Sequence, residues 1–217
     1  MRSEALMNLD TALYFITDST GFEKNEFLRK VRSALEGGVT IIQLREKNRT
    51  TREYVELAEA VHAITKEFNV PLIIDDRIDV MLASGAEGVH VGAEDMPVAV
   101  ARKLIGKDKI LGATAKTVEA ATAAYNDGAD YLGVGAIYPT TTKVKTVLTS
   151  TETLDAITKA VPIPVNAIGG LNSTNLGVLK GINIAGVCAV SAIMKADSPK
   201  AAAEELKKAF DDIRRGA

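Results

Sequence analysis

The chain has 217 residues, of which 47% are apolar and 25% charged, and its formal net charge is −2. It carries no basic excess for nucleic acid, and an aromatic content of 5% without tryptophan leaves little for base stacking. No apolar run approaches the roughly 18–20 residues that span a bilayer, and the N-terminal segment lacks the apolar core of a signal peptide. We therefore expect a cytoplasmic protein with one domain over residues 1–217.

Apolar stretches of strand length alternate with segments of helical periodicity along the chain. We expect strands at 13–16, 39–42, 72–74, 89–91, 110–113, 131–134, 164–168 and 187–190. We expect helices at 25–36, 78–84, 98–105, 118–126, 154–160, 175–179 and 199–213, and a long one whose N-cap is Thr51.

Strands that alternate with helices predict parallel pairing through right-handed crossovers. Eight such units in a little over 200 residues predict an α/β fold, a closed (β/α)8 TIM barrel in a single domain. Glycines at 37, 85, 128 and 181 each begin a helix-to-strand connection, and each interval between them holds two units, which favours the barrel. The alternative is a doubly wound open sheet, which would usually show a G-x-G-x-x-G turn after the first strand; only Gly21 follows Ile16 closely.

A row of polar side chains follows the second predicted strand. Because strand side chains alternate between faces, Gln43, Arg45 and Lys47 share one side, and Leu44 and Glu46 point to the scaffold. An amide, a planar guanidinium and an ammonium together suit a phosphate or pyrophosphate. The alternative is an ordinary charged strand end.

Carboxylates follow the next two strands. Asp75 and Asp76 follow the third strand and Asp95 the fourth, and active sites of this fold form at the C-terminal strand ends. Carboxylates at adjacent strand ends suit a hard cation such as Mg²⁺, which takes oxygen ligands and bridges to phosphates. The alternative is that these residues cap the helices that follow.

Hydroxyl groups and lysines follow the fifth and sixth strands. Thr114 stands near Lys116, which could equally be a solvated loop charge. The long connection after the sixth strand contains Thr140, Thr142 and Lys143, a composition that suits a substrate-covering loop. A merely polar loop is the alternative.

Glycine and serine mark the last two strand ends. Gly169 and Gly170 follow the seventh strand, and Val190 and Ser191 follow the eighth. Glycines let a phosphate approach backbone N–H groups, and these two loops are the usual phosphate site of the barrel. The strand ends therefore predict two anion sites in one mouth, for a phosphorylated and a pyrophosphorylated small molecule.

The remaining reactive side chains are predicted to be structural. We expect His62 to be a surface or half-buried residue of a helix, and His90 to be a hydrogen-bonded core histidine within a strand. The single cysteine, Cys188, cannot form an internal disulfide and lies in an apolar run, so we expect a buried thiol.

The strand ends taken together resemble those of the thiamine phosphate synthase family. The matching segments cover nearly every strand end in order: 43–47, 74–77, 88–97, 112–117, 128–143, 164–170 and 186–193. The most specific part is Gln-x-Arg-x-Lys at 43–47 combined with Pro-Thr-x-Thr-Lys at 139–143.

The resemblance implies a transferase that joins a hydroxymethylpyrimidine pyrophosphate to a hydroxyethylthiazole phosphate, giving thiamine phosphate and pyrophosphate with Mg²⁺ as cofactor. It also implies a dissociative mechanism, in which pyrophosphate leaves before the thiazole nitrogen captures a methylene cation. Such a reaction needs positioning and charge stabilisation and no strong protein base.

The resemblance also implies roles for individual residues. The pyrimidine substrate and its pyrophosphate would be held by Gln43, Arg45, Lys47, Asp75, Thr114 and Lys143, of which Arg45, Lys47 and Lys143 would be catalytic. Mg²⁺ would be held by Asp76 and Asp95. The thiazole phosphate would be held by Thr140, Thr142, Gly170, Val190 and Ser191.

Four positions depart from the family pattern: Asp75 replaces a usual asparagine, Ala93 a glutamine, Lys116 a histidine and Ala136 a proline. Asp75 matters most, because an ionised aspartate only accepts hydrogen bonds. It could bond the pyrimidine amino group, repel the pyrophosphate or become a further Mg²⁺ ligand.

Other functions remain as alternatives. A related thiazole tautomerase would not need Asp76, Asp95 and Lys143, because it has no pyrophosphate to ionise. A catalytically silent regulator that binds a thiamine-related phosphate is a rival from another class. The sequence leaves the oligomeric state open, a homo-oligomer included.

Overall fold

The strands close into a parallel barrel. The structure, a computed structural model, describes residues 9–140 and 147–215. Its strands pair in chain order and β8 pairs with β1; they are β1 (Leu13–Ile16), β2 (Ile41–Leu44), β3 (Leu72–Asp75), β4 (Gly88–Val91), β5 (Ile110–Ala115), β6 (Tyr131–Gly135), β7 (Val165–Ile168) and β8 (Gly186–Ala189). The predicted (β/α)8 TIM barrel is confirmed, and the open sheet is excluded.

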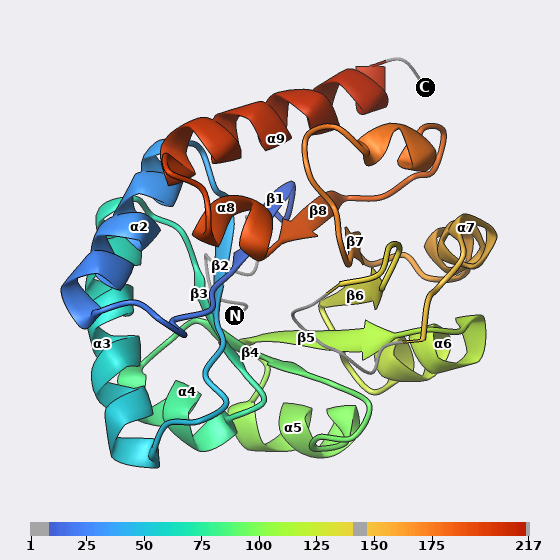
Figure 1. The fold of residues 1–217 in the computed structure, drawn as a ribbon. Coiled ribbons are helices and arrows are strands. Elements are labelled where there is room, and N and C mark those ends of the chain that lie inside the picture. The colour runs from blue at the N-terminus through green and yellow to red at the C-terminus, as the bar shows by residue number, and fades with distance from the viewer. Residues whose placement is uncertain (1–8, 141–146, 216–217) are drawn as a thin grey trace.

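Helices surround the strands (Figure 1). They are α2 (Lys24–Glu36), α3 (Thr51–Glu67), α4 (Ile78–Ser84), α5 (Val98–Ile105), α6 (Val118–Asn126), α7 (Thr151–Ala160), the 3-10 helix η1 (Leu176–Leu179), α8 (Ser191–Met194) and α9 (Pro199–Arg215). The bounds of α4, α5 and α6 coincide with the predicted ones, whereas the single turn α8 was not among the predicted ranges. Within the two described ranges, no helix has the length and apolar character needed to cross a membrane.

The cap of α3 lies one residue earlier than predicted. The side chain of Thr50 accepts a hydrogen bond from the backbone N–H of Glu53, and the Glu53 carboxylate accepts one from the Thr50 backbone. This reciprocal pair satisfies two N–H groups that have no partner within the helix. The cap fixes where α3 begins, directly after the loop that carries Lys47.

Alternation along the strands divides the core into two clusters. Outward residues such as Phe15, Leu44 and Ile74 pack against the helices. The interior holds a smaller cluster of Tyr14, Ile16, Ile41, Ile73, Ile110, Tyr131 and Cys188. The register continues this inward series toward the C-terminal ends, because Ile16 pairs with Gln43 and Asp75 pairs with His90. The interior therefore becomes polar at the end where strand-end residues gather.

Gly112 leaves room in the barrel interior for the side chains of Tyr131 and His90. A Cβ atom at this position would lie 2.2 Å from Cζ of Tyr131, 2.3 Å from its hydroxyl oxygen and 2.5 Å from Nδ1 of His90. These distances are far shorter than van der Waals contact. The absence of a side chain in the middle of β5 therefore allows Tyr131 and His90 to meet.

Substitution Gly112→Ala is expected to lower the free energy of unfolding by about 1–3 kcal/mol, because Tyr131 and His90 must both shift. Chemical denaturation followed by circular dichroism measures this loss. Gly177→Ala in η1 is the matched control, since a Cβ there meets nothing within 4 Å, and it should cause no loss. Equal stability of Gly112→Ala and the unchanged protein would contradict the packing described.

Candidate active site

Charged residues from the ends of β2 and β3 lie against one another. The Lys47 ammonium lies 2.8 Å from Oδ2 of Asp75 and also hydrogen-bonds Asp76. The Arg45 guanidinium Nε lies 3.8 Å from the same oxygen of Asp75. Partial burial lowers the pKa of Lys47, the hydrogen bonds to Asp75 and Asp76 raise it, and the balance leaves it raised. Lys47 is therefore an ammonium between two carboxylates.

A tight turn places the Asp76 carboxylate. Asp76 has a φ of +60°, its N–H donates to the carbonyl of His90 at 2.8 Å, and the N–H of Arg77 donates to the carbonyl of Asp75 at 2.7 Å. The last bond closes a three-residue γ-turn, whose left-handed centre is uncommon for a residue with a side chain. Strained backbone of this kind gathers at functional sites.

None of the three aspartates caps the helix that follows it. The N-cap position of α4 is Arg77 and that of α5 is Pro97, and neither makes a side-chain cap hydrogen bond. Asp95 instead accepts a hydrogen bond from the N–H of Gly92 at 2.8 Å within its own loop. The capping alternative is therefore wrong for Asp75, Asp76 and Asp95.

Asp76 and Asp95 meet at the adjacent ends of β3 and β4. Partial burial, the hydrogen bond with Asp76 and the Asp76 charge raise the pKa of Asp95. Within the described residues, no group of three or more His, Cys, Asp or Glu side chains could hold a metal ion. Two facing carboxylates nevertheless fit Mg²⁺, which commonly takes one or two protein carboxylates and completes its shell with water and substrate phosphates.

The side chains of Tyr54 and Glu46 support the C-terminal end of β2 from outside the barrel. The hydroxyl of Tyr54 on α3 donates to the carbonyl of Leu44 at 2.7 Å. Oε2 of Glu46 accepts hydrogen bonds from Ser19 at 2.8 Å and from Arg49 at 2.9 Å. Glu46 therefore anchors the loop on the scaffold side, while Arg45 and Lys47 contact the carboxylates.

Five polar side chains form a hydrogen-bonded chain through the barrel interior. Nε2 of Gln43 donates to the Tyr14 hydroxyl at 2.8 Å, and this hydroxyl lies 2.6 Å from that of Tyr131. The Tyr131 hydroxyl lies 3.2 Å from Nδ1 of His90, whose Nε2 lies 2.9 Å from Oγ1 of Thr114. Neither tyrosine was among the predicted site residues, although their inward register on β1 and β6 could have identified them.

Burial keeps Tyr14, Tyr131 and His90 in the hydrogen-bonded chain neutral. Burial lowers the pKa of His90 to about 4 and raises those of Tyr14 and Tyr131 well above their ordinary value. His90 is thus the hydrogen-bonded core histidine that was predicted. Cys188 is the buried thiol that was predicted, and burial raises its pKa.

His62 is more deeply buried than the sequence predicted. It is buried, with Nδ1 3.2 Å from the carbonyl of Ser84 and Nε2 2.8 Å from the carboxylate of Glu87. Helical periodicity alone does not reveal a carboxylate that arrives from the loop before β4. Lys116 contributes to a loop contact, because its ammonium donates to the carbonyl of Val147 at 3.0 Å.

The loops after β6 and β7 pack closely together. Gly169 has a φ of +106° and Gly170 one of +66°. A Cβ on Gly169 would lie 2.4 Å from Cβ of Ala136, and the N–H of Tyr138 donates to the carbonyl of Gly169 at 3.0 Å. Thr140 ends the first described range, and the predicted residues Thr142 and Lys143 lie outside the described residues.

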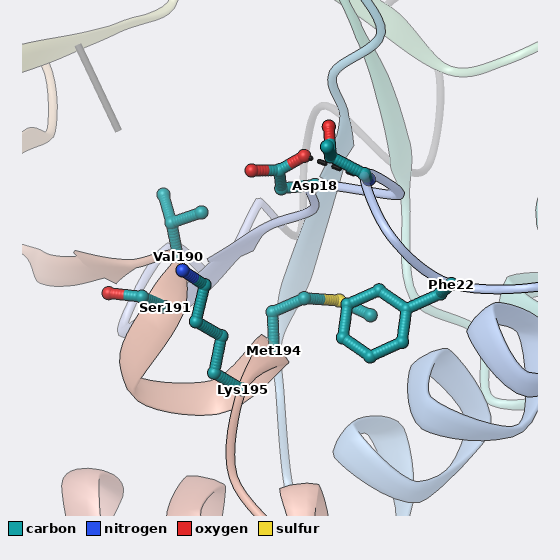
Figure 2. Close-up of a pocket in the computed structure, with 7 residues that line it drawn as sticks. Asp18, Phe22, Val190, Ser191, Met194 and Lys195 are labelled. Carbon is teal, nitrogen blue, oxygen red and sulfur yellow. Dashed lines mark hydrogen bonds between the residues drawn. The ribbon is translucent and has the colours of Figure 1, made fainter. Parts of the chain in front are cut away.

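A pocket of about 60 Å³ lies between the ends of β1 and β8 (Figure 2). Its lining includes the predicted residues Val190 and Ser191, together with Asp18, Thr20, Phe22, Met194 and Lys195. The N–H of Thr20 donates to Asp18 at 3.1 Å, the bond drawn in Figure 2. Lys195, directly after α8, adds a cation that the sequence analysis did not single out.

The predicted residues that the structure describes therefore share one end of the barrel. The strands are parallel, so their C-terminal ends form a common mouth. The Lys47 cluster, which consists of Arg45, Lys47, Asp75, Asp76 and Asp95, and the Val190–Ser191 pocket lie at different strand ends of this mouth. Cations, facing carboxylates and glycine-lined loops in one mouth define a (β/α)8 enzyme that acts on phosphorylated small molecules.

The comparisons with known proteins agree with this class. The family model of thiamine monophosphate synthase matches residues 13–193. Thiamine-phosphate synthase from Clostridium tetani is 47% identical over 94% of this chain and 98% of its own, and thiamine-phosphate synthase 2 from Streptococcus pneumoniae is 50% identical over 93% and 96%. Thiamine phosphate pyrophosphorylase from Pyrococcus furiosus has a TM-score of 0.83 at 40% identity, covering 93% of this chain and 96% of its own.

The chain belongs to the thiamine monophosphate synthase family. Its activity is accordingly that of a transferase, as the resemblance of its strand ends implied. The individual roles of the site residues stay predictions.

The stability of the protein is expected to depend on the protonation of His90. Its pKa is about 4 when folded and near its ordinary value of about 6.5 when unfolded, so between these pH values the unfolded chain binds more protons. The contribution of neutral His90 to the free energy of unfolding is therefore complete above about pH 6.5. Roughly 3 kcal/mol of this free energy is lost as the pH falls toward 4. Denaturation at several pH values measures this loss, and an equally steep loss in His90→Asn would contradict its assignment to His90.

Proposed function

We propose that this chain condenses 4-amino-2-methyl-5-hydroxymethylpyrimidine pyrophosphate with 4-methyl-5-(2-hydroxyethyl)thiazole phosphate, with Mg²⁺ as cofactor, to give thiamine phosphate and pyrophosphate. The observation that carries the proposal is the Lys47 cluster. It combines Arg45, Lys47 and two facing carboxylates in the mouth that also contains the Val190–Ser191 pocket. A pyrophosphate with its cation and a separate phosphate would occupy these two parts of the mouth.

The proposed reaction begins with loss of pyrophosphate. The bond between the pyrimidine methylene carbon and the pyrophosphate oxygen breaks, and its electron pair leaves with the oxygen. Arg45, Lys47 and Lys143 meet the charge that grows on the leaving group. Mg²⁺ held by Asp76 and Asp95 would neutralise part of the same charge.

The second step forms the new carbon–nitrogen bond. The electron-rich aminopyrimidine stabilises the methylene cation, and the thiazole nitrogen donates its lone pair to it. Gly170, Val190, Ser191, Thr140 and Thr142 would hold the thiazole phosphate, which orients this nitrogen. Gln43 and Asp75 would hold the pyrimidine, and Thr114 would contact its pyrophosphate. Neither step requires a protein base, and the pKa of His90, which burial lowers to about 4, makes this residue a weak one.

One assay tests the proposal. The purified protein, Mg²⁺ and both substrates should yield equal amounts of thiamine phosphate and pyrophosphate, and omission of either substrate should abolish both products. Absence of product from a folded protein that still binds the thiazole phosphate would overturn the proposal and favour the silent regulator. Isomerisation of a thiazole phosphate tautomer without condensation would favour the tautomerase.

The cellular location and assembly follow as further proposals. An enzyme of this kind acts on small phosphorylated molecules, and we place it in the cytoplasm, where a homo-oligomer and a single chain are both open as its assembly. Light scattering of the purified protein measures the mass and decides between the two.

Substitution Asp95→Ala is expected to raise the Mg²⁺ concentration for half-maximal activity by about tenfold or more, because one of two protein ligands is removed. A Mg²⁺ titration of the reaction rate measures this shift. Glu94→Ala is the matched control, since it removes a neighbouring exposed carboxylate without touching the proposed ligands. An unaltered titration for Asp95→Ala would refute its role.

Substitution Lys195→Ala is expected to raise the KM for the thiazole phosphate by roughly three- to tenfold, because a cation beside the Ser191 pocket is lost. Steady-state kinetics at saturating pyrimidine substrate measures the change, and kcat should stay nearly the same. Lys208→Ala, an exposed position on α9, should leave both constants unchanged. A lower kcat with unchanged KM would exclude Lys195 from the phosphate site.

A further inference from the structure

The interior hydrogen-bonded chain joins two proposed substrate residues through three others. Gln43 on β2 and Thr114 on β5 stand at its ends, and both would contact the pyrimidine substrate. Tyr14, Tyr131 and His90 lie between them, with exposed fractions of 1%, 0% and 9%. A buried chain in which each group depends on the next is unlike an isolated polar residue, because its members cannot reorient separately.

Each hydroxyl in the chain has one hydrogen, and a buried hydrogen needs an acceptor, so the direction of every bond follows from its first member. Nε2 of Gln43 donates to the oxygen of Tyr14, and the hydrogen of Tyr14 then has the oxygen of Tyr131 as its acceptor at 2.6 Å. The hydrogen of Tyr131 in turn has Nδ1 of His90 as its acceptor at 3.2 Å. Nδ1 must therefore carry a lone pair.

The remaining nitrogen of His90 completes the chain. A neutral imidazole with a lone pair on Nδ1 carries its hydrogen on Nε2. Nε2 lies 2.9 Å from Oγ1 of Thr114 and donates to it. An imidazolium, or the opposite tautomer, would place two hydrogens between His90 and Tyr131 and leave a buried donor without an acceptor, an arrangement that proteins avoid.

We propose that His90, held by Tyr131 and Tyr14, is a positioning residue that turns the Thr114 hydroxyl into a hydrogen-bond donor toward the pyrophosphate group. Because Oγ1 of Thr114 accepts from His90, its own hydrogen is directed to another partner. The leaving group offers only acceptor oxygens, and a donor fixed in advance stabilises its growing charge. The inference rests on the proposed function for the identity of that group, but the direction of the chain does not.

The direction of the chain can be measured without any substrate. The ¹⁵N chemical shifts of the imidazole nitrogens distinguish the two neutral tautomers from the imidazolium. The sequence has two histidines, so the signals that vanish in His90→Asn belong to His90. If His90→Asn does not fold, the signals that persist in His62→Gln make the same assignment. The neutral Nε2–H tautomer at pH 7 is the expected result, and an Nδ1–H tautomer or an imidazolium would overturn the proposal even if the proposed reaction is correct.

A double-mutant cycle tests whether His90 acts through Thr114. Thr114→Val and His90→Asn should each lower kcat/KM for the pyrimidine substrate by about tenfold or more, since each removes the oriented donor. The kcat/KM of the double variant should be no lower than that of Thr114→Val alone. Without the Thr114 hydroxyl, the loss of His90 removes no further hydrogen bond to the substrate. Losses that multiply would show that His90 acts elsewhere and would overturn the proposal.

A conservative variant separates positioning from general support of the fold. The amide of His90→Asn occupies the place of Nδ1 and cannot reach Thr114, whereas that of His90→Gln extends toward the place of Nε2 and can donate to Oγ1. His90→Gln should therefore retain kcat/KM within about threefold, and the KM for the thiazole phosphate should be unchanged in both. Equal losses in folded His90→Gln and His90→Asn would overturn the proposal. Failure of the unchanged protein to form thiamine phosphate would instead count against the proposed function.

Discussion

The Lys47 ammonium joins the ends of β2 and β3 at the C-terminal mouth of the barrel. Asp75 and Asp76 are adjacent in sequence, and Lys47 contacts both. Two neighbouring carboxylates repel each other, and the cation between them offsets that repulsion. The same contact joins the loop after β2 to the end of β3, so one side chain contributes both to the electrostatic balance of the site and to the position of its loop.

This arrangement bears on the aspartate at position 75. Its carboxylate accepts a hydrogen bond from Lys47 and lies near Arg45, so part of the positive charge at the mouth is already balanced within the protein. A neutral amide in the same place would leave both cations more strongly attractive to a pyrophosphate. We therefore expect Asp75 to moderate the affinity of the mouth for the proposed pyrophosphate.

The sequence was sufficient for the fold and for predicting which candidate residues gather at one end of the barrel. Strand-length apolar runs, helical stripes and recurring glycines predicted the barrel, and the strand-end rule then selected Arg45, Lys47, Asp76 and Asp95 as neighbours. The tyrosine pair could not be found in this way, since Tyr14 and Tyr131 lie 117 positions apart and meet only across the closed barrel. His62 was misjudged for a similar reason, because its partner Glu87 belongs to a different element.

The missing side chain at position 112 has a consequence for how this sequence can change during evolution. The space beside β5 is filled by the Tyr131 ring and the His90 imidazole, so the three positions form one packing unit. A lineage that acquires a larger residue at 112 must change the side chains at both 131 and 90, and an intermediate with only some of these changes is destabilised. Among related chains, these three positions should therefore vary together, with the combination of glycine, tyrosine and histidine inherited as a set.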